Sequence, residues 1–419
     1  MLINYYSWFS FLNYYYYNKW LYKYTYLFLN SYFSIYLFYM GVILGLLVFF
    51  LSFNRFKYTF KFGVYLYLLF IALVYNLVTT NNLFQFFFYY EFLFTPSFLL
   101  VYFTAPNRRG VFASLYFFFW TQGGSLFLLI GWLYMYISTG LCLFTEIKFV
   151  SQYFSNIELN LIAFLCFLGF GIKIPVWPFY YWLTKTHVEA PTFFSIYLSG
   201  FLVKTALYGL YLWYLYFPSI IISYFFIGIV IFGVHDSTIK MWSQTDLKKL
   251  VAFGTVQEMN LITLLFLFGG VQSSIIGILF CLTHTILSTL FFFIVDVIYR
   301  LYRVRTRSNL VGLSVLNPWL GFYIIISVIL YTGLPFTLKF ICEFNLFIFL
   351  LHHSISQLVF LILTIQIIGN AIWMYQWFGI LYGQPHTSLY RTGGLLLTDH
   401  LVFIIAFSHL IFGTIISLI

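Results

Sequence analysis

Seven ionisable residues stand inside long apolar stretches of the sequence, where charge is energetically expensive. An ionised side chain near the middle of a bilayer costs about 2.5–3.5 kcal/mol even on lenient insertion scales. Side chains of this kind therefore tend to face one another or water, and they typically serve ion or proton pathways. The seven residues are Glu91, Lys173, Lys204, Glu258, His284, Lys339 and Glu343.

The chemistry that these residue types support is proton transfer. Burial disfavours the charged form of a lysine or a glutamate, and an opposite charge close by favours it again. A buried lysine beside a glutamate can therefore exchange a proton after a modest conformational change. Histidine can relay protons near neutral pH, which makes His187 and His284 candidate relays.

Structural roles remain open for several of these residues. Glu91, Lys173 and Lys204 could form ion pairs that only hold helices together. His284 could be a histidine whose hydrogen bonds serve helix packing. Lys339 could extend its charged end toward the membrane surface, because the depth of its segment is not fixed by the sequence.

Helix breakers accompany the charges in two of the apolar stretches. Pro175 and Pro178 follow the first lysine of the set, and Gly333 with Pro335 precede its last glutamate. A proline inside a helix frees a carbonyl and invites a kink or an unwound turn. Unwound backbone at membrane depth is tolerated only where protein or a water-filled cavity surrounds it. Broken helices at corresponding positions of two halves are typical of inverted-repeat transporters.

The elements that must position these residues are transmembrane helices. The chain has 419 residues, of which 63% are hydrophobic and 7% charged. Such a composition predicts an all-α polytopic membrane protein with about twelve transmembrane helices, or thirteen if the N-terminal segment holds one more. Spans are expected near 36–54, 60–79, 82–103, 111–137, 157–178, 191–216, 219–236, 247–268, 270–298, 319–351, 355–381 and 399–418. The stretch 319–351 is too long for one straight span, so we expect it to be broken.

The span pattern divides the chain into two similar halves with peripheral segments. Each half is expected to contain five spans, with the broken helix in fourth place, as in an inverted repeat. The predicted units are an aromatic-rich N-terminal segment (1–35), a peripheral span (36–59), a first half (60–216), a second half (219–381), and a C-terminal loop with a last span (382–419).

Charge and cysteine usage exclude other classes of function. The net charge of +10 comes mostly from short loops, so it indicates orientation in a membrane and not nucleic-acid binding. Alternating the loops between two sides places nearly all of their Lys and Arg on one side and Lys148 alone on the other. The four cysteines are scattered and predict no metal site. The sequence also lacks a Gly-rich nucleotide loop and a cysteine cluster for iron–sulfur binding, so any redox chemistry belongs to another chain.

One stretch resembles the signature of subunit 4 of respiratory complex I, the antiporter-like family of proton-pumping membrane subunits. It is "KIPVWPFYYWLTKTHVEAPTFFSIYLSGFLVKTALYG", residues 173–209. Four further stretches match the family in order: "YYEFLFTP", "QTDLKKLVAFGTVQEMN", "THTILSTLFF" and "GLPFTLKFICEF". The resemblance thus covers residues 82–350.

The resemblance implies roles for individual residues. Glu91 and Lys204 would form the carboxylate–lysine pair that responds to neighbouring subunits. Lys173 would be the lysine on the broken helix of the first half. His284 would be the connecting relay and Glu343 the terminal acid on the second broken helix.

The sequence also departs from the family pattern. His187 matches the His of the His-x-Glu-Ala-Pro turn, but Tyr180 stands where the family has a His, seven residues after the lysine. Glu258 stands where another His is expected, and it could pair with Lys204 or His284. Tyrosine is a poor proton acceptor, so a water would have to assist Tyr180 if that residue is a relay. Lys339 is a further candidate relay.

The resemblance implies partners and a location. The chain would lie in the mitochondrial inner membrane with its basic loops on the matrix side, beside lipids and the antiporter-like subunits 2 and 5. It would hold no cofactor itself, and FMN, iron–sulfur clusters, NADH and ubiquinone would be used by other subunits of the NADH:ubiquinone reductase. A cation/proton antiporter subunit that is not coupled to NADH oxidation is the alternative. A structural membrane-arm subunit without pumping is a third interpretation.

Overall fold

The chain folds almost entirely into helices. The computed structural model describes residues 33–37, 39–40, 59–105, 107–146, 154–216, 220–352, 356–385 and 394–418. Within these residues, the extended pairings are two isolated bridges, Asn82 with Leu143 and Asp246 with Thr306. The all-α prediction is confirmed. The predicted N-terminal segment and the predicted span 36–54 lie almost wholly outside the described residues.

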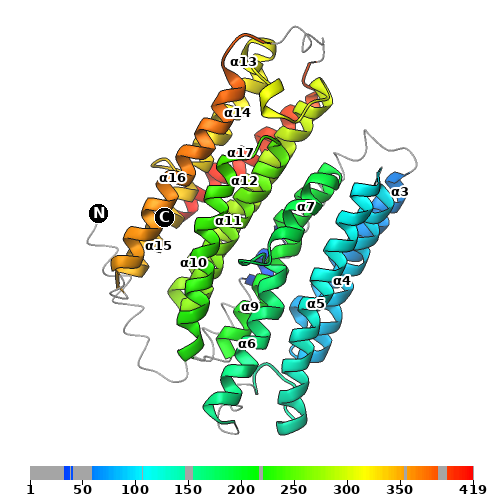
Figure 1. Cartoon of the computed structure of the whole chain (residues 1–419), viewed down its shortest axis with the longest axis vertical. Helices are drawn as coiled ribbons and strands as arrows, with labels where there is room; N and C mark the ends of the chain where they lie inside the picture. The colour runs from blue at the N-terminus through cyan, green and yellow to red at the C-terminus, as the bar shows by residue number, and fades with distance from the viewer. Residues whose placement is uncertain are drawn as a thin grey trace.

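The first half forms one side of the bundle (Figure 1). Helix α4 carries Glu91, α6 ends at Lys173, and α9 carries Lys204. The elements of the first half are α3 (Thr59–Thr79), α4 (Leu83–Thr104), α5 (Arg108–Thr139), α6 (Asn156–Lys173), α7 (Tyr181–Glu189), and a continuous helix made of α8 (Thr192–Tyr197), the π-helical turn η2 (Leu198–Leu202) and α9 (Val203–Tyr216).

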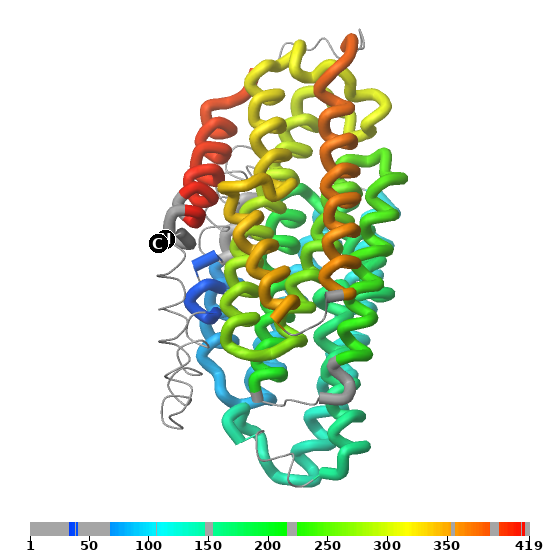
Figure 2. Tube along the Cα trace, turned by 90° about the vertical axis from the view of Figure 1, so that its left-hand side faces the viewer, coloured from blue at the N-terminus to red at the C-terminus, as the bar shows by residue number. Residues whose placement is uncertain are grey.

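The second half lies beside the first, and its helices α11 and α12 are buried almost throughout. Helix α17 packs against α12 and α15 at the edge of the bundle (Figure 2). The elements of the second half are α10 (Ile220–Trp242), α11 (Leu247–Phe268), α12 (Val271–Tyr302), the 3₁₀ turn η3 (Arg307–Asn309), α13 (Leu313–Leu316), α14 (Pro318–Tyr331), α15 (Leu338–His352) and α16 (Ser356–Leu381). Helix α17 (Leu397–Leu418) follows them in the chain.

Most predicted spans correspond to one helix of the structure. Eight helices in the described part of the chain are long and apolar enough to cross a membrane, and shorter apolar helices accompany them. The chain is therefore a multi-pass membrane protein. The two spans with helix breakers differ from single helices: the predicted span 157–178 ends at Lys173, and the predicted span 319–351 divides into α14 and α15.

Polar side chains set several helix starts. Asn82 accepts a hydrogen bond from the backbone of Phe84, and Asp246 accepts from the first turn of α11. Ser155 and Glu158 form a reciprocal capping box at the start of α6. These side chains satisfy N–H groups that a helix leaves without partners in its first turn, so the boundaries follow from local sequence.

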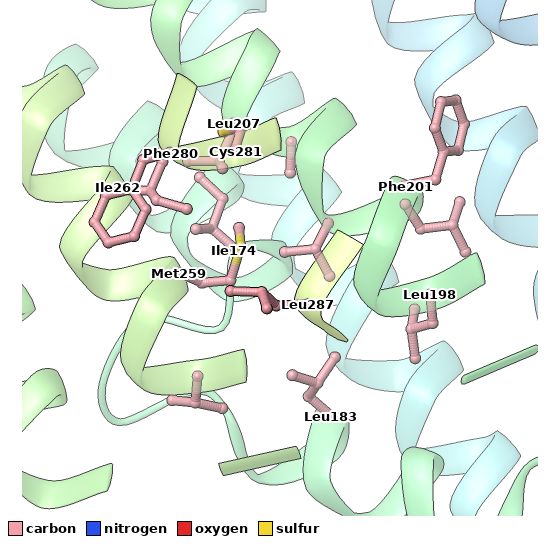
Figure 3. Packing of buried hydrophobic residues seen from close by; sticks show 14 of the residues in the cluster. Ile174, Leu183, Leu198, Phe201, Leu207, Met259, Ile262, Phe280, Cys281 and Leu287 are labelled. Atoms are coloured by element: carbon pink, nitrogen blue, oxygen red, sulfur yellow. The ribbon is translucent and has the colours of Figure 1, made fainter. Parts of the chain in front are cut away.

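Small residues and apolar side chains hold the helices together. A Cβ added at Gly124 of α5 would lie 3.1 Å from the carbonyl oxygen of Gly169 in α6, so glycine permits close approach of the two backbones. Figure 3 shows the apolar packing in the centre, where Met259 of α11 and Leu287 of α12 lie near Ile174. This packing fixes the helices that carry the charged residues.

Basic loops come together at one end of the bundle. Arg305 donates to the carbonyl of Val188 at 2.9 Å and lies 3.7 Å from Asp246. Lys248 donates to the carbonyl of Ala190. Loops that the charge pattern assigns to one side of the membrane are therefore in direct contact, and we call this part of the molecule the basic end.

Candidate proton-transfer site

The first break follows Lys173, the last residue of α6. Residues 174–180 form an irregular turn before α7 begins. Two side chains donate hydrogen bonds to carbonyls at this break: Asn260 of α11 to Pro175 at 3.3 Å, and Trp182 to Ile172 at 2.9 Å. Buried carbonyls released from a helix need such partners, and here protein side chains provide them.

Lys173 pairs with Glu91 of α4. The distance from Lys173 Nζ to Glu91 Oε1 is 2.5 Å, and the lysine is fully buried. The ammonium also lies 3.9 Å from the ring centre of Tyr90 and 4.0 Å from that of Phe94. The expected pairing of Glu91 with Lys204 is therefore wrong in this structure, because α6 and not α9 presents its lysine to α4.

Lys204 lies in the centre of the bundle and contacts a histidine. Its Nζ is 2.5 Å from His284 Nδ1, and it donates to the carbonyl of Ser199. Ser199 belongs to the π-helical turn η2, in which backbone carbonyls deviate from regular helical bonding, and such turns frequently mark functional sites. His284 Nε2 is buried and has no hydrogen-bond partner among the described residues.

The second break separates α14 from α15. Residues 332–337 leave the helix, with positive φ angles of +66° at Gly333 and +70° at Phe336. Asn370 of α16 donates to the carbonyl of Thr332 at 3.1 Å. A neighbouring helix thus supplies a hydrogen-bond donor to this break, as α11 does at the first.

Lys339 pairs with Glu258 just after the second break. The distance from Nζ to Glu258 Oε1 is 2.5 Å, and both side chains are almost fully buried. Glu343 Oε1 lies 3.7 Å from the same nitrogen, and the ring centre of Tyr331 lies 3.7 Å away. The expectation that Lys339 extends to the membrane surface is wrong. Glu258 of α11 contacts Lys339 near the start of α15, and not Lys204 or His284.

His187 and Tyr180 stand apart from these pairs. His187 is fully buried and stacks on Phe292 with 4.7 Å between ring centres. Within the described part of the chain, neither of its ring nitrogens has a hydrogen-bond partner. Tyr180 forms hydrogen bonds with Asp236 and Lys240 of α10, and among the described residues none links it to Lys173 or His187.

Sequence reasoning missed several polar residues that contact the candidate site. Asp236 falls at the end of the predicted span 219–236, and Lys240 falls in the predicted loop, but α10 continues to Trp242. An Asp and a Lys four residues apart could have signalled a further helical turn. Asn260 and Asn370 are neutral, so a search for ionisable residues does not find them.

In the described part of the chain, ligand-type residues do not gather as a metal ion would require. Among the described residues, no three His, Cys, Asp or Glu side chains gather at a spacing suited to a metal ion. The four cysteines are free thiols, and three of them are buried. The candidate site is thus a set of lysine, glutamate and histidine side chains, suited to holding and passing protons.

Comparison with known proteins identifies the family of this chain. Residues 80–369 match the family described as NADH:quinone oxidoreductase/Mrp antiporter, TM. NADH-ubiquinone oxidoreductase chain 4 of Paramecium tetraurelia is 42% identical over 325 residues, which cover 78% of this chain and 68% of the relative. The protein of the same name from Acanthamoeba castellanii is 29% identical over 387 residues, which cover 88% and 75%.

Two solved structures share the fold. A chain of the archaeal membrane-bound sulfane sulfur reductase superposes with a TM-score of 0.79 at 18% identity, covering 91% of this chain and 79% of that one. A chain of the Mrp complex from Dietzia sp. DQ12-45-1b gives 0.76 at 21% identity, covering 84% and 67%. The chain therefore belongs to the NADH:quinone oxidoreductase/Mrp antiporter family of membrane subunits and, within it, to the NADH-ubiquinone oxidoreductase chain 4 proteins.

Proposed function

We propose that this chain is the antiporter-like, proton-translocating subunit 4 of the membrane arm of respiratory complex I. NADH oxidation and ubiquinone reduction take place elsewhere in the complex, and this chain transfers protons across the membrane. The observation that carries the proposal is the set of three buried lysines, each 2.5 Å from a carboxylate or an imidazole, on or beside interrupted helices. Relatives named as chain 4 of NADH-ubiquinone oxidoreductase support the coupling to redox chemistry.

Each lysine can act as a proton carrier whose charge depends on its partner. A buried ammonium is stabilised by a neighbouring carboxylate and loses that support when the carboxylate moves away. Lys173 then releases a proton and becomes neutral, and it takes up a proton again when Glu91 returns. The two breaks make such movement feasible, because unwound backbone can change its dihedral angles without disrupting a continuous helix.

His284 connects the centre to the second half. Its Nδ1 faces Lys204 at 2.5 Å, and its Nε2 is available for another donor or acceptor. When Lys204 gives a proton to Nδ1, the ring becomes an imidazolium. Loss of the Nε2 proton then returns the ring to neutral with its tautomer exchanged. One proton has then crossed the ring, and we propose that His284 relays it from Lys204 toward the Glu258–Lys339 pair.

The wider assembly follows from the same proposal. The chain lies in the mitochondrial inner membrane, with the basic end on the matrix side. Its neighbours are lipids and other membrane-arm subunits, with the antiporter-like subunits 2 and 5 beside it. FMN, iron–sulfur clusters, NADH and ubiquinone are bound by other chains.

A cation/proton antiporter subunit without coupling to NADH oxidation is the second candidate. The fold shared with the Mrp complex chain favours it. The two candidates differ in what purifies with the chain. Co-purification with flavin and iron–sulfur subunits supports the respiratory assignment, whereas sodium-dependent transport without NADH oxidation supports the antiporter.

The proposal is tested by Lys204→Ala and Glu91→Ala in the assembled complex. Proton translocation per NADH oxidised is measured in reconstituted vesicles. We expect coupled proton transfer per assembled complex to fall, with Lys185→Met, a partly exposed lysine on α7, as the control that behaves like wild type. Wild-type pumping and turnover in both assembled variants would remove these residues from the mechanism.

A further inference from the structure

A second polar cluster, formed by Tyr180, Asp236 and Lys240, connects the first break with the surface. The Tyr180 hydroxyl donates to Asp236 Oδ2 and accepts a hydrogen bond from Lys240 Nζ. Lys240 Nζ also lies 2.8 Å from Asp236 Oδ2. Each member of the cluster therefore contacts the other two. We call these residues the Tyr180 cluster.

Exposure increases along this cluster. Tyr180 is 4% exposed, the side chain of Asp236 is 21% exposed, and that of Lys240 is 44% exposed. Tyr180 directly precedes α7 and thus ends the irregular turn that begins after Lys173. The buried end of the cluster therefore lies at the first break, and its exposed end lies in the last turn of α10.

Helix α10 runs along the first break on the face that carries the cluster. A Cβ added at Gly233 would lie 2.5 Å from Asn260 Oδ1 and 3.2 Å from the Cβ of Trp177, so this part of α10 touches the break. Positions 233, 236 and 240 share one face of a helix. Asn260 Oδ1 is buried, and within the described residues it has no hydrogen-bond partner. A water molecule could satisfy this oxygen.

The exposed end of the cluster faces the basic end of the bundle. The turn after α10 pairs with the start of η3, where the backbone of Arg307 donates to the carbonyl of Thr245 at 2.8 Å. Asp246 of the same turn lies 3.7 Å from Arg305. The cluster therefore lies between the first break and the loops that carry most of the basic residues.

We propose that the Tyr180 cluster is a proton relay that connects Lys173 with water at the basic end. This inference rests on the proposed function. The resemblance assigns no role to Asp236 or Lys240, so the cluster adds these two side chains to the proposed proton pathway. It would take the place of the histidine that the resemblance leads one to expect at position 180.

The transfer can be written with every proton accounted for. The Asp236 carboxylate takes a proton from a hydronium ion at the basic end, which leaves a water, and becomes neutral. The Tyr180 hydroxyl, which donates to Asp236 in the structure, then turns toward the break. Asp236 gives its proton to the Tyr180 oxygen while the original hydroxyl proton passes to a water in the break, which becomes a hydronium ion. Asp236 is a carboxylate again, and Tyr180 ends neutral because a hydroxyl both donates and accepts. The proton then reaches Lys173 when its amine is neutral, and Lys240 keeps its charge throughout.

A purely structural role predicts something different. An Asp–Lys pair four residues apart on a partly exposed helix face contributes little to stability. Such a pair does not require a buried tyrosine hydroxyl between its members. If the cluster served stability alone, removing the hydroxyl would change the stability of the complex and leave proton transfer intact.

The test uses the intact complex carrying Tyr180→Phe or Asp236→Asn. Proton translocation and coupled NADH:quinone turnover are measured in vesicles and divided by NADH–ferricyanide activity, which counts assembled complexes. We expect each variant to lose proton transfer about a hundredfold, because a positioned proton donor or acceptor is removed. Tyr180→His should recover most of the rate, since imidazole both accepts and donates a proton. Tyr181→Phe removes a hydroxyl from the next, exposed residue and should match wild type.

The outcomes separate this inference from the proposed function. If Asp236→Asn and Tyr180→Phe pump like wild type while Lys173→Met does not, the relay is wrong and the proposed function stands. If Lys173→Met also pumps like wild type, the proposed function is wrong as well. Should Tyr180→Phe fail to assemble, Asp236→Asn decides, because its partly exposed side chain tolerates an amide of the same shape.

Discussion

The two broken helices use the same types of residue in a different order. In the first half, Lys173 is the last residue before the break, whereas in the second half Lys339 follows the break. Each lysine lies 2.5 Å from a glutamate on the second helix of its own half, Glu91 of α4 or Glu258 of α11. The pairing is thus repeated although the sequence around the two lysines differs.

The breaks differ in where their hydrogen bonds come from. Asn370 of α16 serves the second break from within the same half. The first break receives one bond from Trp182 of its own half and another from Asn260, which belongs to α11 of the second half. Glu258 lies two residues before Asn260 on the same helix. A displacement of α11 would therefore act on the first break and on the second lysine together, which gives the two halves a physical connection.

The two lysines also differ in the charge around them. One carboxylate faces Lys173, with two aromatic rings over its ammonium. Two carboxylates face Lys339, since Glu343 lies 3.7 Å away in addition to Glu258. Buried carboxylates need a neighbouring cation or a proton. The second lysine is thus the more critical of the two for keeping buried charge neutralised.

The largest effect is expected from Lys339→Met. Removing one partner of a buried ion pair destabilises by about 3–5 kcal/mol, because the remaining charge is left uncompensated. Lys339→Met leaves two carboxylates in this state, whereas Lys173→Met leaves only Glu91, whose side chain is 15% exposed. We expect Lys339→Met to reduce the amount of assembled complex more than Lys173→Met, as measured by native electrophoresis and the thermal midpoint.

A double variant provides the control for this prediction. Combining Lys339→Met with Glu258→Gln removes both charges of the pair, and assembly should recover in large part while proton transfer stays low. Equal loss of assembly in the two single lysine variants would contradict the inferred difference between the halves. Full proton transfer in the double variant would show that the second pair is only structural.

A smaller effect is expected from the asparagines that serve the breaks. Asn260→Leu and Asn370→Leu each leave a buried carbonyl without its donor, which costs about 1–3 kcal/mol. Both should lower the thermal midpoint of the solubilised complex. Asn260→Leu should in addition reduce proton transfer, since it releases the first break from α11. Asn309→Leu changes an exposed asparagine in η3 and should have little effect. If Asn370→Leu lost proton transfer and Asn260→Leu did not, the inferred connection of the two halves through α11 would be wrong.

The sequence predicts much of the fold because the membrane imposes strong local constraints. Apolar runs locate the helices, and Pro175 and Gly333 with their proline neighbours locate the breaks. The high cost of buried charge also makes Lys173, Lys204 and Lys339 visible without a structure. These features depend on single residues and their near neighbours, so they can be read directly.

The pairing of the charges could not be predicted in the same way. It depends on how each helix is rotated about its axis and on which helices are neighbours. The π-helical turn Leu198–Leu202 precedes Lys204, and one additional residue rotates the following helix by about 100°. No residue pattern in the sequence indicates this π-helical turn. The resemblance therefore gave Glu91 the wrong partner, since its carboxylate contacts Lys173, and it gave no indication of Asp236.

The smallest effect concerns the backbone of the second break. Phe336 has a φ of +70°, which costs a residue with a Cβ about 1–2 kcal/mol, and its side chain is 88% exposed. Phe336→Gly should therefore raise the thermal midpoint slightly, since the strain disappears and few contacts are lost. Gly333→Ala is the matched opposite: its φ is +66°, and the new Cβ would lie 2.8 Å from Glu343 Oε2. If Phe336→Gly instead lowered the midpoint in the complex, the exposed ring would be bound by a neighbouring subunit, and the second break would differ from the first in having an external contact.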